Sequence, residues 1–507
     1  MKLSSLADEA LLALENLAES ASGLGVPTLR LGVTGLARAG KTVFITALVH
    51  NLLHGGRLPL FDAAAGRRIT RVSLQPQPDD AVPRFDYEAH VDALVKERIW
   101  PQSTRQVSEL RLTIEYESAS FLTRKLGRGK LHLDIIDYPG EWLLDLPLLT
   151  KDYRQFSAEA MALARSPARA SVALPYLSEL ARHDPAAPES ETDARALAKA
   201  FTAYLAGCRA EEHALSMLPP GRFLMPGDLD GSPALTFAPL ALPESGQAPA
   251  GSLWAMMERR YEAYRKHVVR PFFREHFARL DRQIVLVDAL QALNAGPDAL
   301  RDLETALGQV LTSFRPGRAS WLASILTRRI DRILFAATKA DHLHRDDHDR
   351  LEAILKRLVT RGIEHAEFSG AEVDVLALAA VRATREATVR HAGEELPAIL
   401  GTPLPGERVN GDSFDGRTEI AMFPGDLPSD PESLFQSLES NSAKVQSLES
   451  ESEHEAHARL DSSHEDGLRF VRFRPPHLER TAEGLTLSLP HIRLDRALNF
   501  LIGDRIA

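Results

Sequence analysis

The chain of 507 residues is predicted to be an α/β protein, in which a mostly parallel sheet carries helices on both faces and is interrupted by a mainly helical insert. Three observations predict this fold. About six short apolar or β-branched runs are separated by helix-length segments, as in a parallel sheet buried on both faces. A glycine-rich loop joins the first run to an apolar stretch of helix length. Residues 141–282 are rich in Ala, Leu, Glu and Arg and contain few strand-like runs.

The predicted strands are residues 29–34, 110–116, 131–136, 284–290, 333–337 and 373–378. The second and third are separated by a turn that contains glycine, and we expect them to pair as neighbours. Residues 43–53 have the length and apolar spacing of a buried helix that ends at Gly55 and Gly56. Residues 494–502 are predicted to form a terminal helix.

These elements divide the chain into four predicted parts. Residues 1–140 and 283–402 form the two halves of the sheet domain, and residues 141–282 form the helical insert. Residues 403–507 are expected to hold C-terminal strands and a helix. Within them, residues 433–467 are rich in Ser, Glu and His and include QSLES twice. Such a composition cannot bury enough apolar surface to fold, so this segment is predicted to be a disordered loop.

Composition excludes several classes of function. The formal net charge of -10, with no dense Lys/Arg stripe, argues against a nucleic-acid partner. The single cysteine, Cys208, excludes an intramolecular disulfide and indicates a reducing compartment. Acidic residues interrupt the apolar residues near the amino terminus, and no apolar segment is long enough to span a bilayer. The sequence therefore predicts a cytoplasmic protein without a transmembrane segment.

The glycine-rich loop reads GLARAGKT from Gly35 to Thr42. Its glycines let successive backbone N–H groups point at phosphate oxygens, while the following helix presents its positive end. We expect Lys41 to reach the β- and γ-phosphates of a nucleotide and the Thr42 hydroxyl to bind Mg²⁺. Other predicted nucleotide contacts in and after this loop are Gly35, Arg38, Ala39, Gly40 and Val43. For Arg38 the alternative is an ordinary solvated loop arginine.

Two further elements are expected to complete the phosphate end of the site. Asp137 ends a strand in DYPG, where its carboxylate can hold Mg²⁺ and the Gly140 N–H can reach the γ-phosphate. A strand-ending Asp before a Pro-Gly turn is the simpler alternative. Thr104, in the loop after the first helix, is the candidate for a second hydroxyl that binds Mg²⁺ and senses the γ-phosphate, with Ser103 as the next choice. An ordinary loop hydroxyl explains it equally well.

The base end of the site is predicted from TKAD, residues 338–341, which follows a strand. The Asp341 carboxylate can accept hydrogen bonds from the ring N–H and the exocyclic amine of guanine, a donor pair that adenine lacks. The alternative is an Asp that caps the next helix. Lys339 is expected to lie along the base plane. Backbone N–H groups after the next strand, at Ala379 and Ala380 with Val381 beside them, are expected to face the guanine oxygen.

A cluster of possible metal ligands follows TKAD. It consists of His342, His344, Asp346, Asp347, His348 and Asp349. The residue types suit a transition metal, but a polar helix start explains the cluster more simply.

Several blocks of the sequence resemble the bacterial YcjX-like family of P-loop GTPases, and the resemblance spans almost the whole chain. The blocks are GLARAGKT, DYPGEWLLDLPLL, VLVDALQALN, TKADHLH, ALAAVRAT and LDRALNFLIGD. Residues 433–467 look like an insertion peculiar to this sequence. The resemblance implies a G-domain with a helical insert that binds GDP or GTP and Mg²⁺. It also implies an association with envelope stress near a membrane-protein partner, with peripheral contact at the inner membrane.

Hydrolysis is the least defined prediction. GTPases often orient the attacking water with a glutamine after the glycine of this strand-end motif, whereas here Glu141 follows Gly140. Glu141 is therefore the candidate for orienting the water, and Lys41 and Thr104 are the other predicted catalytic residues. The alternative is that catalysis needs a partner protein. A slow GTPase switch is the preferred interpretation. The rival functions are a P-loop ATPase or kinase, and a scaffold that nucleotide stabilises without turnover.

Overall fold

The computed structural model describes residues 26–36, 38–102, 104–119, 129–312, 330–368, 370–391, 394–409, 412–435, 470–478 and 488–507. A seven-stranded sheet forms its centre, with the strand order β2-β3-β4-β1-β5-β6-β7. The strands are β1 (Thr28–Gly35), β2 (Ile69–Leu74), β3 (Ser108–Tyr116), β4 (Gly129–Asp137), β5 (Arg282–Val287), β6 (Arg332–Ala337) and β7 (Glu372–Ala377). Strands β1, β4, β5, β6 and β7 are parallel, β3 pairs antiparallel with β4, and the edge strand β2 pairs antiparallel with β3. The predicted α/β fold and the pairing of β3 with β4 are confirmed.

Two features of the sheet differ from the sequence prediction. Strand β2 was not predicted, because it is a half-exposed edge strand whose polar residues weaken the apolar signal. Strand β5 ends at Val287, so the predicted extension to residue 290 is wrong. The reason is Asp288, whose side chain accepts from the Gln291 N–H and caps helix α12 (Ala289–Ala295).

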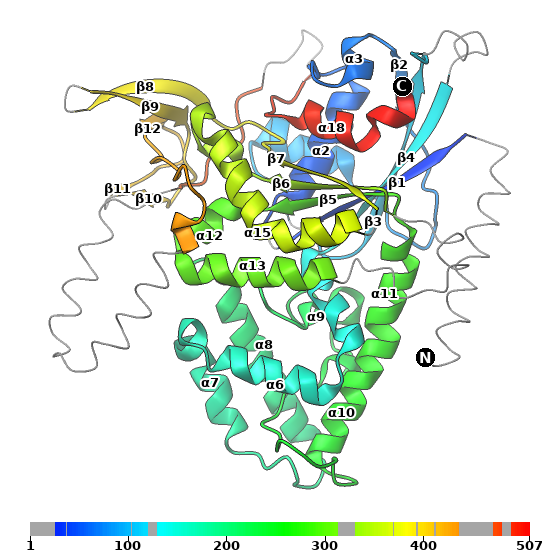
Figure 1. Cartoon of the computed structure of the whole chain (residues 1–507), viewed down its shortest axis with the longest axis vertical. Helices are drawn as coiled ribbons and strands as arrows, with labels where there is room; N and C mark the ends of the chain where they lie inside the picture. The colour runs from blue at the N-terminus through cyan, green and yellow to red at the C-terminus, as the bar shows by residue number, and fades with distance from the viewer. Residues whose placement is uncertain are drawn as a thin grey trace.

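Helices cover both faces of the sheet (Figure 1). On one face lie α2 (Lys41–Leu53) and α18 (Leu494–Ile502), and on the other lie α13 (Pro297–Thr312) and α15 (His348–Phe368). Side chains along β6 point alternately to the two faces of the sheet. Leu334 packs in the core on the α2 side, and Phe335 packs in the core on the α13 side. The predicted terminal helix, residues 494–502, is confirmed as α18.

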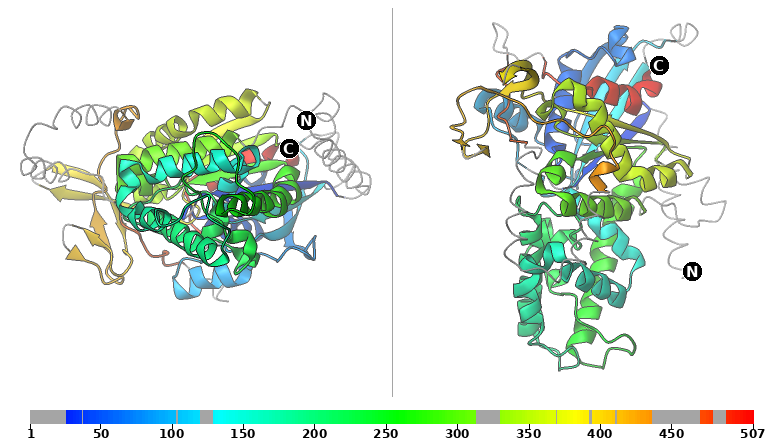
Figure 2. Two further views of the ribbon diagram at one scale, coloured as in Figure 1. Left: turned by 90° about the horizontal axis from the view of Figure 1, so that it is seen from below. Right: turned by 60° about the vertical axis from the view of Figure 1, so that its left-hand side comes forward.

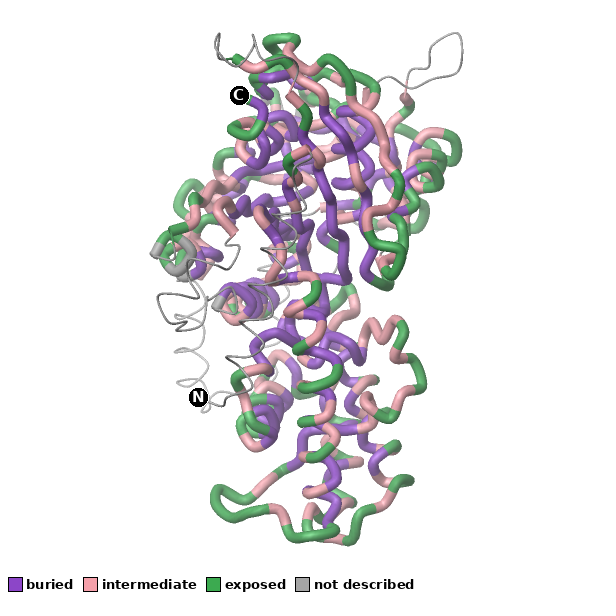
Figure 3. The backbone as a smooth tube through the Cα atoms, turned by 90° about the vertical axis from the view of Figure 1, so that its right-hand side faces the viewer, coloured by how far each residue is buried: buried purple, intermediate pink, exposed green. Residues whose placement is uncertain are grey.

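The segment between β4 and β5 is helical and extends away from the sheet along the long axis of the molecule (Figures 1 and 2). Its main elements are η2 (Gly140–Thr150), α6 (Tyr153–Ala164), α7 (Ala170–Leu180), α8 (Glu191–Arg209), α9 (Gly221–Leu224), α10 (Leu253–Tyr264), η6 (Arg265–Val269) and α11 (Arg270–Glu275). We call this segment the insert. One buried apolar cluster includes Phe201 and Tyr261 of the insert and Phe335 of the sheet. Figure 3 shows buried stretches of backbone in both parts. The insert is therefore packed on the sheet rather than joined to it by a linker.

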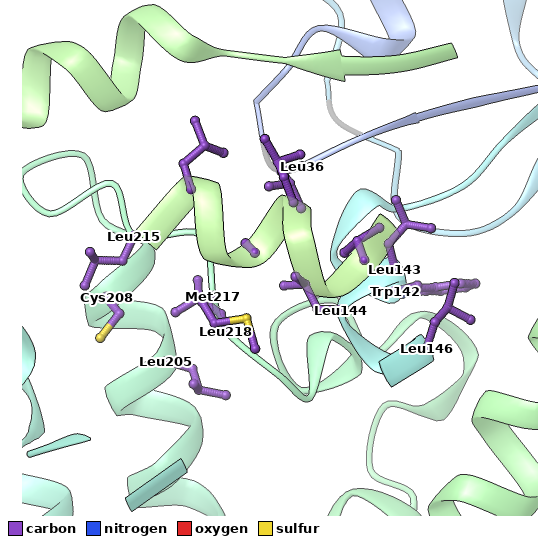
Figure 4. Packing of buried hydrophobic residues seen from close by; sticks show 14 of the residues in the cluster. Leu36, Trp142, Leu143, Leu144, Leu146, Leu205, Cys208, Leu215, Met217 and Leu218 are labelled. Carbon is purple, nitrogen blue, oxygen red and sulfur yellow. The ribbon is translucent and has the colours of Figure 1, made fainter. Parts of the chain in front are cut away.

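The upper end of the insert packs beside the glycine-rich loop. Figure 4 shows Leu36 of that loop in the same cluster as Trp142 and Leu144 of η2 and Leu215 beyond α8. Because the cluster is close-packed, a shift of the loop at Leu36 must be accommodated by these insert residues.

A smaller region is formed by the C-terminal part of the chain. Strands β8 (Arg385–His391), β9 (Glu394–Gly401) and β12 (Ile420–Met422) form one antiparallel sheet, and β10 (Arg408–Val409) pairs with β11 (Asp412–Ser413). Residues 470–474, which we call the C-terminal strap, run back along residues 402–404. The Leu404 N–H donates to the Arg472 carbonyl at 2.7 Å, and the Arg474 N–H donates to the Thr402 carbonyl at 2.8 Å.

Most of the predicted disordered loop, residues 436–467, lies outside the described residues. The first three residues of the predicted loop, residues 433–435, are described and are ordered. Phe435 packs against the apolar core and lies under the guanidinium of Arg357, 4.5 Å from it, and Arg357 also pairs with Glu432. Among the described residues, the structure holds no helix with the length and apolar character needed to cross a membrane.

Candidate nucleotide-binding site

The glycine-rich loop, residues 35–42, lies between β1 and α2 as predicted and is called the phosphate loop below. Gly40 adopts a left-handed conformation (φ 81°), which favours glycine, and no side chain caps the N-terminus of α2 that follows it. The uncapped N–H groups and the helix dipole make this terminus an anion site. Lys41 Nζ donates to the Gly35 carbonyl at 3.0 Å, so the lysine is held across its own loop.

The three predicted magnesium ligands lie together, whereas Ser103, the next choice for the loop hydroxyl, lies outside the described residues. Thr42 and Thr104 have their hydroxyl oxygens 3.2 Å apart, and the Thr104 hydroxyl donates to Asp137 Oδ2. Asp137 is buried, and its other oxygen, Oδ1, has no hydrogen-bond partner in the described part of the chain. Burial raises the pKa of Asp137 to about 6, against the opposing effects of the Lys41 charge and the Thr104 hydrogen bond.

This arrangement fits Mg²⁺. An unpaired buried carboxylate oxygen is costly unless a cation or a donor meets it. Mg²⁺ prefers oxygen ligands and is commonly held by one or two carboxylates together with phosphates and water. The carboxylate of Asp137 and the hydroxyls of Thr42 and Thr104 are such ligands.

Gly140 lies directly on the phosphate loop. A Cβ atom at this position would lie 1.6 Å from the Gly35 carbonyl oxygen and 3.0 Å from Lys41 Nζ. Only glycine permits this approach, and it brings the backbone after β4 beside the loop that is predicted to hold the phosphates.

The predicted base-reading element follows β6. Lys339 adopts a left-handed conformation (φ 62°), and its ammonium group pairs with Asp288 at the end of the neighbouring strand. Asp341 is buried, and its Oδ2 accepts from the Ala383 N–H at 2.7 Å. Burial raises the pKa of Asp341 to about 6. The Asp341 carboxylate is thus fixed in place by the chain after β7.

One cavity of about 760 Å³ joins the two ends of the site. Its volume is in the range of about 300–1,000 Å³ that is usual for small-molecule sites. The predicted nucleotide contacts among its lining are Arg38, Ala39, Gly40, Lys41, Thr42, Val43, Thr104, Lys339, Asp341, Ala379, Ala380 and Val381. The Ala379 N–H donates to the Ile492 carbonyl at 3.1 Å, so this amide already has an acceptor.

Glu141 lies apart from this cavity. Its Oε1 accepts from Arg209 at the end of α8, at 3.1 Å, and the side chain is buried. The carboxylate lines a smaller neighbouring cavity with Arg38 and Arg209. In this structure, therefore, the candidate for orienting water faces the insert.

The possible metal cluster after TKAD is dispersed into separate contacts. His342 packs edge-on against Phe473, with ring centroids 5.3 Å apart, and burial lowers the pKa of His342 to about 3. Asp347 pairs with Arg350 at 2.8 Å. Within the described ranges no three His, Cys, Asp or Glu side chains are arranged to hold a metal ion. His348 and Asp349 begin α15, and the other residues of the cluster lie in the turns that precede it.

Three features of the site were not predicted. Asp288 directly follows β5 and pairs with Lys339. An Asp at the carboxyl end of a parallel strand is a signal that the sequence offered here, as it did for Asp137. Glu211, just beyond α8, and the C-terminal strap both line the cavity. No local sequence pattern marks either of them, because they meet the site only through the tertiary fold.

A phosphate loop between the first strand and helix of a mostly parallel sheet places this chain in the P-loop class of α/β proteins. More narrowly, the chain belongs to the YcjX-like family, which it matches over residues 29–506. It is 37% identical over 492 residues to the Escherichia coli (strain K12) protein named Ras-like GTPase YcjX, covering 94% of this chain and 96% of that protein. It is 34% identical over 502 residues to the Shewanella oneidensis protein of the same name, covering 94% of each.

Proposed function

We propose that this protein binds guanine nucleotide with Mg²⁺ and hydrolyses GTP slowly, as a switch. The observation that carries the proposal is the single cavity bordered at one end by Lys41, Thr42 and Thr104 and at the other by Lys339 and Asp341. The name Ras-like GTPase, which two full-length relatives carry, supports it.

At the phosphate end, the chain's own groups are suited to gather negative charge. The N-terminus of α2 donates N–H groups, and Lys41 exchanges its contact with the Gly35 carbonyl for phosphate oxygens. Thr42, Thr104 and Asp137 would hold Mg²⁺, which when bound neutralises charge on the β- and γ-phosphates. Because Thr104 comes from a separate loop, it can link that loop to the nucleotide state.

At the base end, the buried Asp341 carboxylate is suited to guanine. It keeps Oδ2 on the Ala383 N–H and has acceptor capacity left for the ring N–H and amine of the base. The ion pair of Lys339 with Asp288 holds its side chain beside the cavity, and the proposal has it lie along the base. Adenine offers no such pair of donors on that edge, which disfavours the ATPase alternative.

The contact between Glu141 and Arg209 supports a slow rate. A residue that orients water must reach the γ-phosphate region, and Glu141 is bound elsewhere. Hydrolysis through Glu141 would require that ion pair to open. Turnover by the isolated protein is therefore expected to be slow, as in a switch whose partner speeds hydrolysis.

Competition binding against a fluorescent GDP tests the proposal. GTP and GDP should displace the probe at least a hundredfold more effectively than ATP, and Lys41→Ala should nearly abolish binding. Lys96→Ala is the matched control, because Lys96 pairs with Asp92 on a surface helix and does not line the cavity. Equal binding of ATP and GTP would favour the ATPase. Nucleotide binding with no phosphate release in the presence of Mg²⁺ would favour the scaffold.

The association with envelope stress and peripheral contact with a membrane-protein partner are proposed from the family resemblance. The expected result is that a tagged chain sediments with inner membranes from stressed cells more than from unstressed cells, and that Lys41→Ala reduces the difference. Equal distribution in both conditions, for both variants, would argue against this part of the proposal.

A further inference from the structure

The end of helix α8 reaches both loops at the phosphate end of the site. Arg209, the last residue of α8, pairs with Glu141 beside Gly140, at 3.1 Å. Two residues later, Glu211 Oε1 lies 3.1 Å from Arg38 Nη1 in the phosphate loop. One short segment of the insert thus holds a charged side chain from each loop.

Glu211 has a second cationic partner. Arg472 of the C-terminal strap places Nη1 2.5 Å from the same Oε1 atom, and its Nη2 lies 2.5 Å from Glu407. All four residues line the nucleotide cavity. They form a chain of ion pairs along its wall, in the order Arg38, Glu211, Arg472, Glu407.

The strap itself is anchored at other parts of the site. Trp100, in the loop that leads to Thr104, donates its indole N–H to the Phe473 carbonyl at 2.6 Å. The Phe473 ring packs on His342, next to Asp341. The backbone that carries Arg472 is therefore fixed by contacts with its neighbours, whereas Arg38 lies on the phosphate loop.

We propose that Glu211 is a positioning residue that competes with the nucleotide phosphates for Arg38, so that the insert regulates, and responds to, the occupant of the site. This inference rests on the proposed function. In the structure, Arg38 is held by Glu211. When a triphosphate binds, its oxygens offer Arg38 a stronger, bidentate partner, and Glu211 keeps Arg472 as its counter-ion.

The exchange has a low cost because no charge is left unpaired. Arg38 moves from a carboxylate to a phosphate, and Glu211 remains neutralised by Arg472. The contact between the phosphate loop and the end of α8 is then lost. By reciprocity, anything that holds the insert against Arg38 weakens triphosphate binding by the same factor.

The test is a double-mutant cycle on GTP affinity at low ionic strength, where exposed ion pairs are least screened. Glu211→Gln should tighten GTP binding about two- to fivefold, the range expected for an exposed pair. In an Arg38→Gln background, Glu211→Gln should change GTP affinity no more than the control substitution Glu212→Gln does. Glu211→Asp, which keeps the carboxylate, should return affinity toward the wild-type value.

Glu212→Gln is the matched control. Glu212 also lines the cavity and carries the same charge, but it has no ion pair with any of the described residues. It therefore measures the general effect of removing one negative charge near the phosphates. Arg472→Gln is a second test, and it should lower GTP affinity instead of raising it. Without Arg472, Glu211 holds Arg38 more tightly. The loss of affinity should therefore disappear in the Arg38→Gln background.

The outcomes separate this inference from the proposed function. A wild-type chain that binds no guanine nucleotide would overturn both. If the chain binds GTP through Lys41 but Glu211→Gln changes GTP affinity equally with and without Arg38, that result would overturn only the role of Glu211. The same holds if Glu211→Gln and Glu212→Gln have equal effects, or if Glu211→Gln lowers thermal stability and leaves affinity unchanged.

Discussion

The hydroxyl of Thr42 lies 3.2 Å from the hydroxyl of Thr104, although 62 residues separate them in the chain. The Thr104 hydroxyl also donates to Asp137, so Thr104 links three oxygen-bearing side chains from three segments of the chain. The carboxylate is the only one of the three that ionises near neutral pH, and its titration should therefore govern the affinity for Mg²⁺.

Mg²⁺-dependent GTP binding is expected to weaken as the pH falls below 6. Burial raises the pKa of Asp137 to about 6, so below that pH Mg²⁺ must displace a proton, and its affinity should fall by about tenfold per pH unit. Titrations from pH 5 to 8, with and without Mg²⁺, measure this effect. Asp137→Asn should lose the Mg²⁺-dependent part. A flat profile in the wild type would contradict the assignment.

The pKa of Asp341 is also raised to about 6, and this effect can be separated. Its protonation should weaken guanine binding whether or not Mg²⁺ is present. The effect of pH on folding stability is opposite to its effect on ligand binding. Because folding raises both pKa values, the folded state binds more protons than the unfolded state between pH 3.8 and about 6. The nucleotide-free protein should therefore lose stability as the pH rises from 3.8 to about 6.

Gly140→Ala should lower GTP affinity at least tenfold. The new Cβ would overlap the Gly35 carbonyl oxygen, 1.6 Å away, so the phosphate loop or the backbone after β4 must move. Overpacking of this kind typically costs about 1–3 kcal/mol of stability. The matched control is Gly308→Ala in helix α13, where a Cβ meets nothing within 4 Å and should stabilise the helix slightly. Wild-type affinity in a folded Gly140→Ala variant would show that this contact is unimportant.

Deleting residues 436–467 should leave GTP affinity and turnover unchanged. Their composition lacks the apolar residues of a core, and every predicted nucleotide contact lies outside them. The deletion starts after Phe435 because that ring packs under Arg357. A deletion that starts at residue 433 is the comparison, and it should lower the melting temperature. Loss of binding in the shorter deletion would show that residues 436–467 are needed for the site.

The sequence allowed the central sheet and the main site motifs to be predicted because these signals are local. Apolar strand runs reveal β1 and β6, and the phosphate loop and Asp341 fall in short patterns tied to the ends of those strands. The edge strand β2 was missed because one of its faces is partly exposed. The end of β5 was misplaced because Asp288 caps a helix whose apolar residues continue the strand pattern.

The remaining parts of the site are defined by contacts between distant segments. Arg472 and Glu211 are 261 residues apart, and neither lies in a motif. Their ion pair depends on how the insert and the C-terminal strap pack around the phosphate loop. Charged residues of this kind resemble ordinary surface residues in the sequence, so only the tertiary structure identifies them.

The identity of the base can be tested at Asp341. Asp341→Asn should shift the preference from GTP toward xanthosine triphosphate, because the two bases differ where the carboxylate is proposed to bind. Guanine presents an exocyclic amine there, and xanthine presents a carbonyl oxygen. A carboxylate accepts from the amine and repels the carbonyl, whereas an asparagine amide donates to the carbonyl.

The surroundings of Asp341 favour a clear result. Its Oδ2 accepts from the Ala383 N–H, so an asparagine oxygen can keep that bond and accept from the ring N–H, which leaves the amide nitrogen for the xanthine carbonyl. Loss of the charge-assisted pair with guanine should cost about 1.5–3 kcal/mol, or ten- to hundredfold in GTP affinity. Competition binding with both triphosphates measures the shift. If the variant keeps the wild-type margin for GTP, Asp341 does not bind the base, and the ATPase alternative gains support.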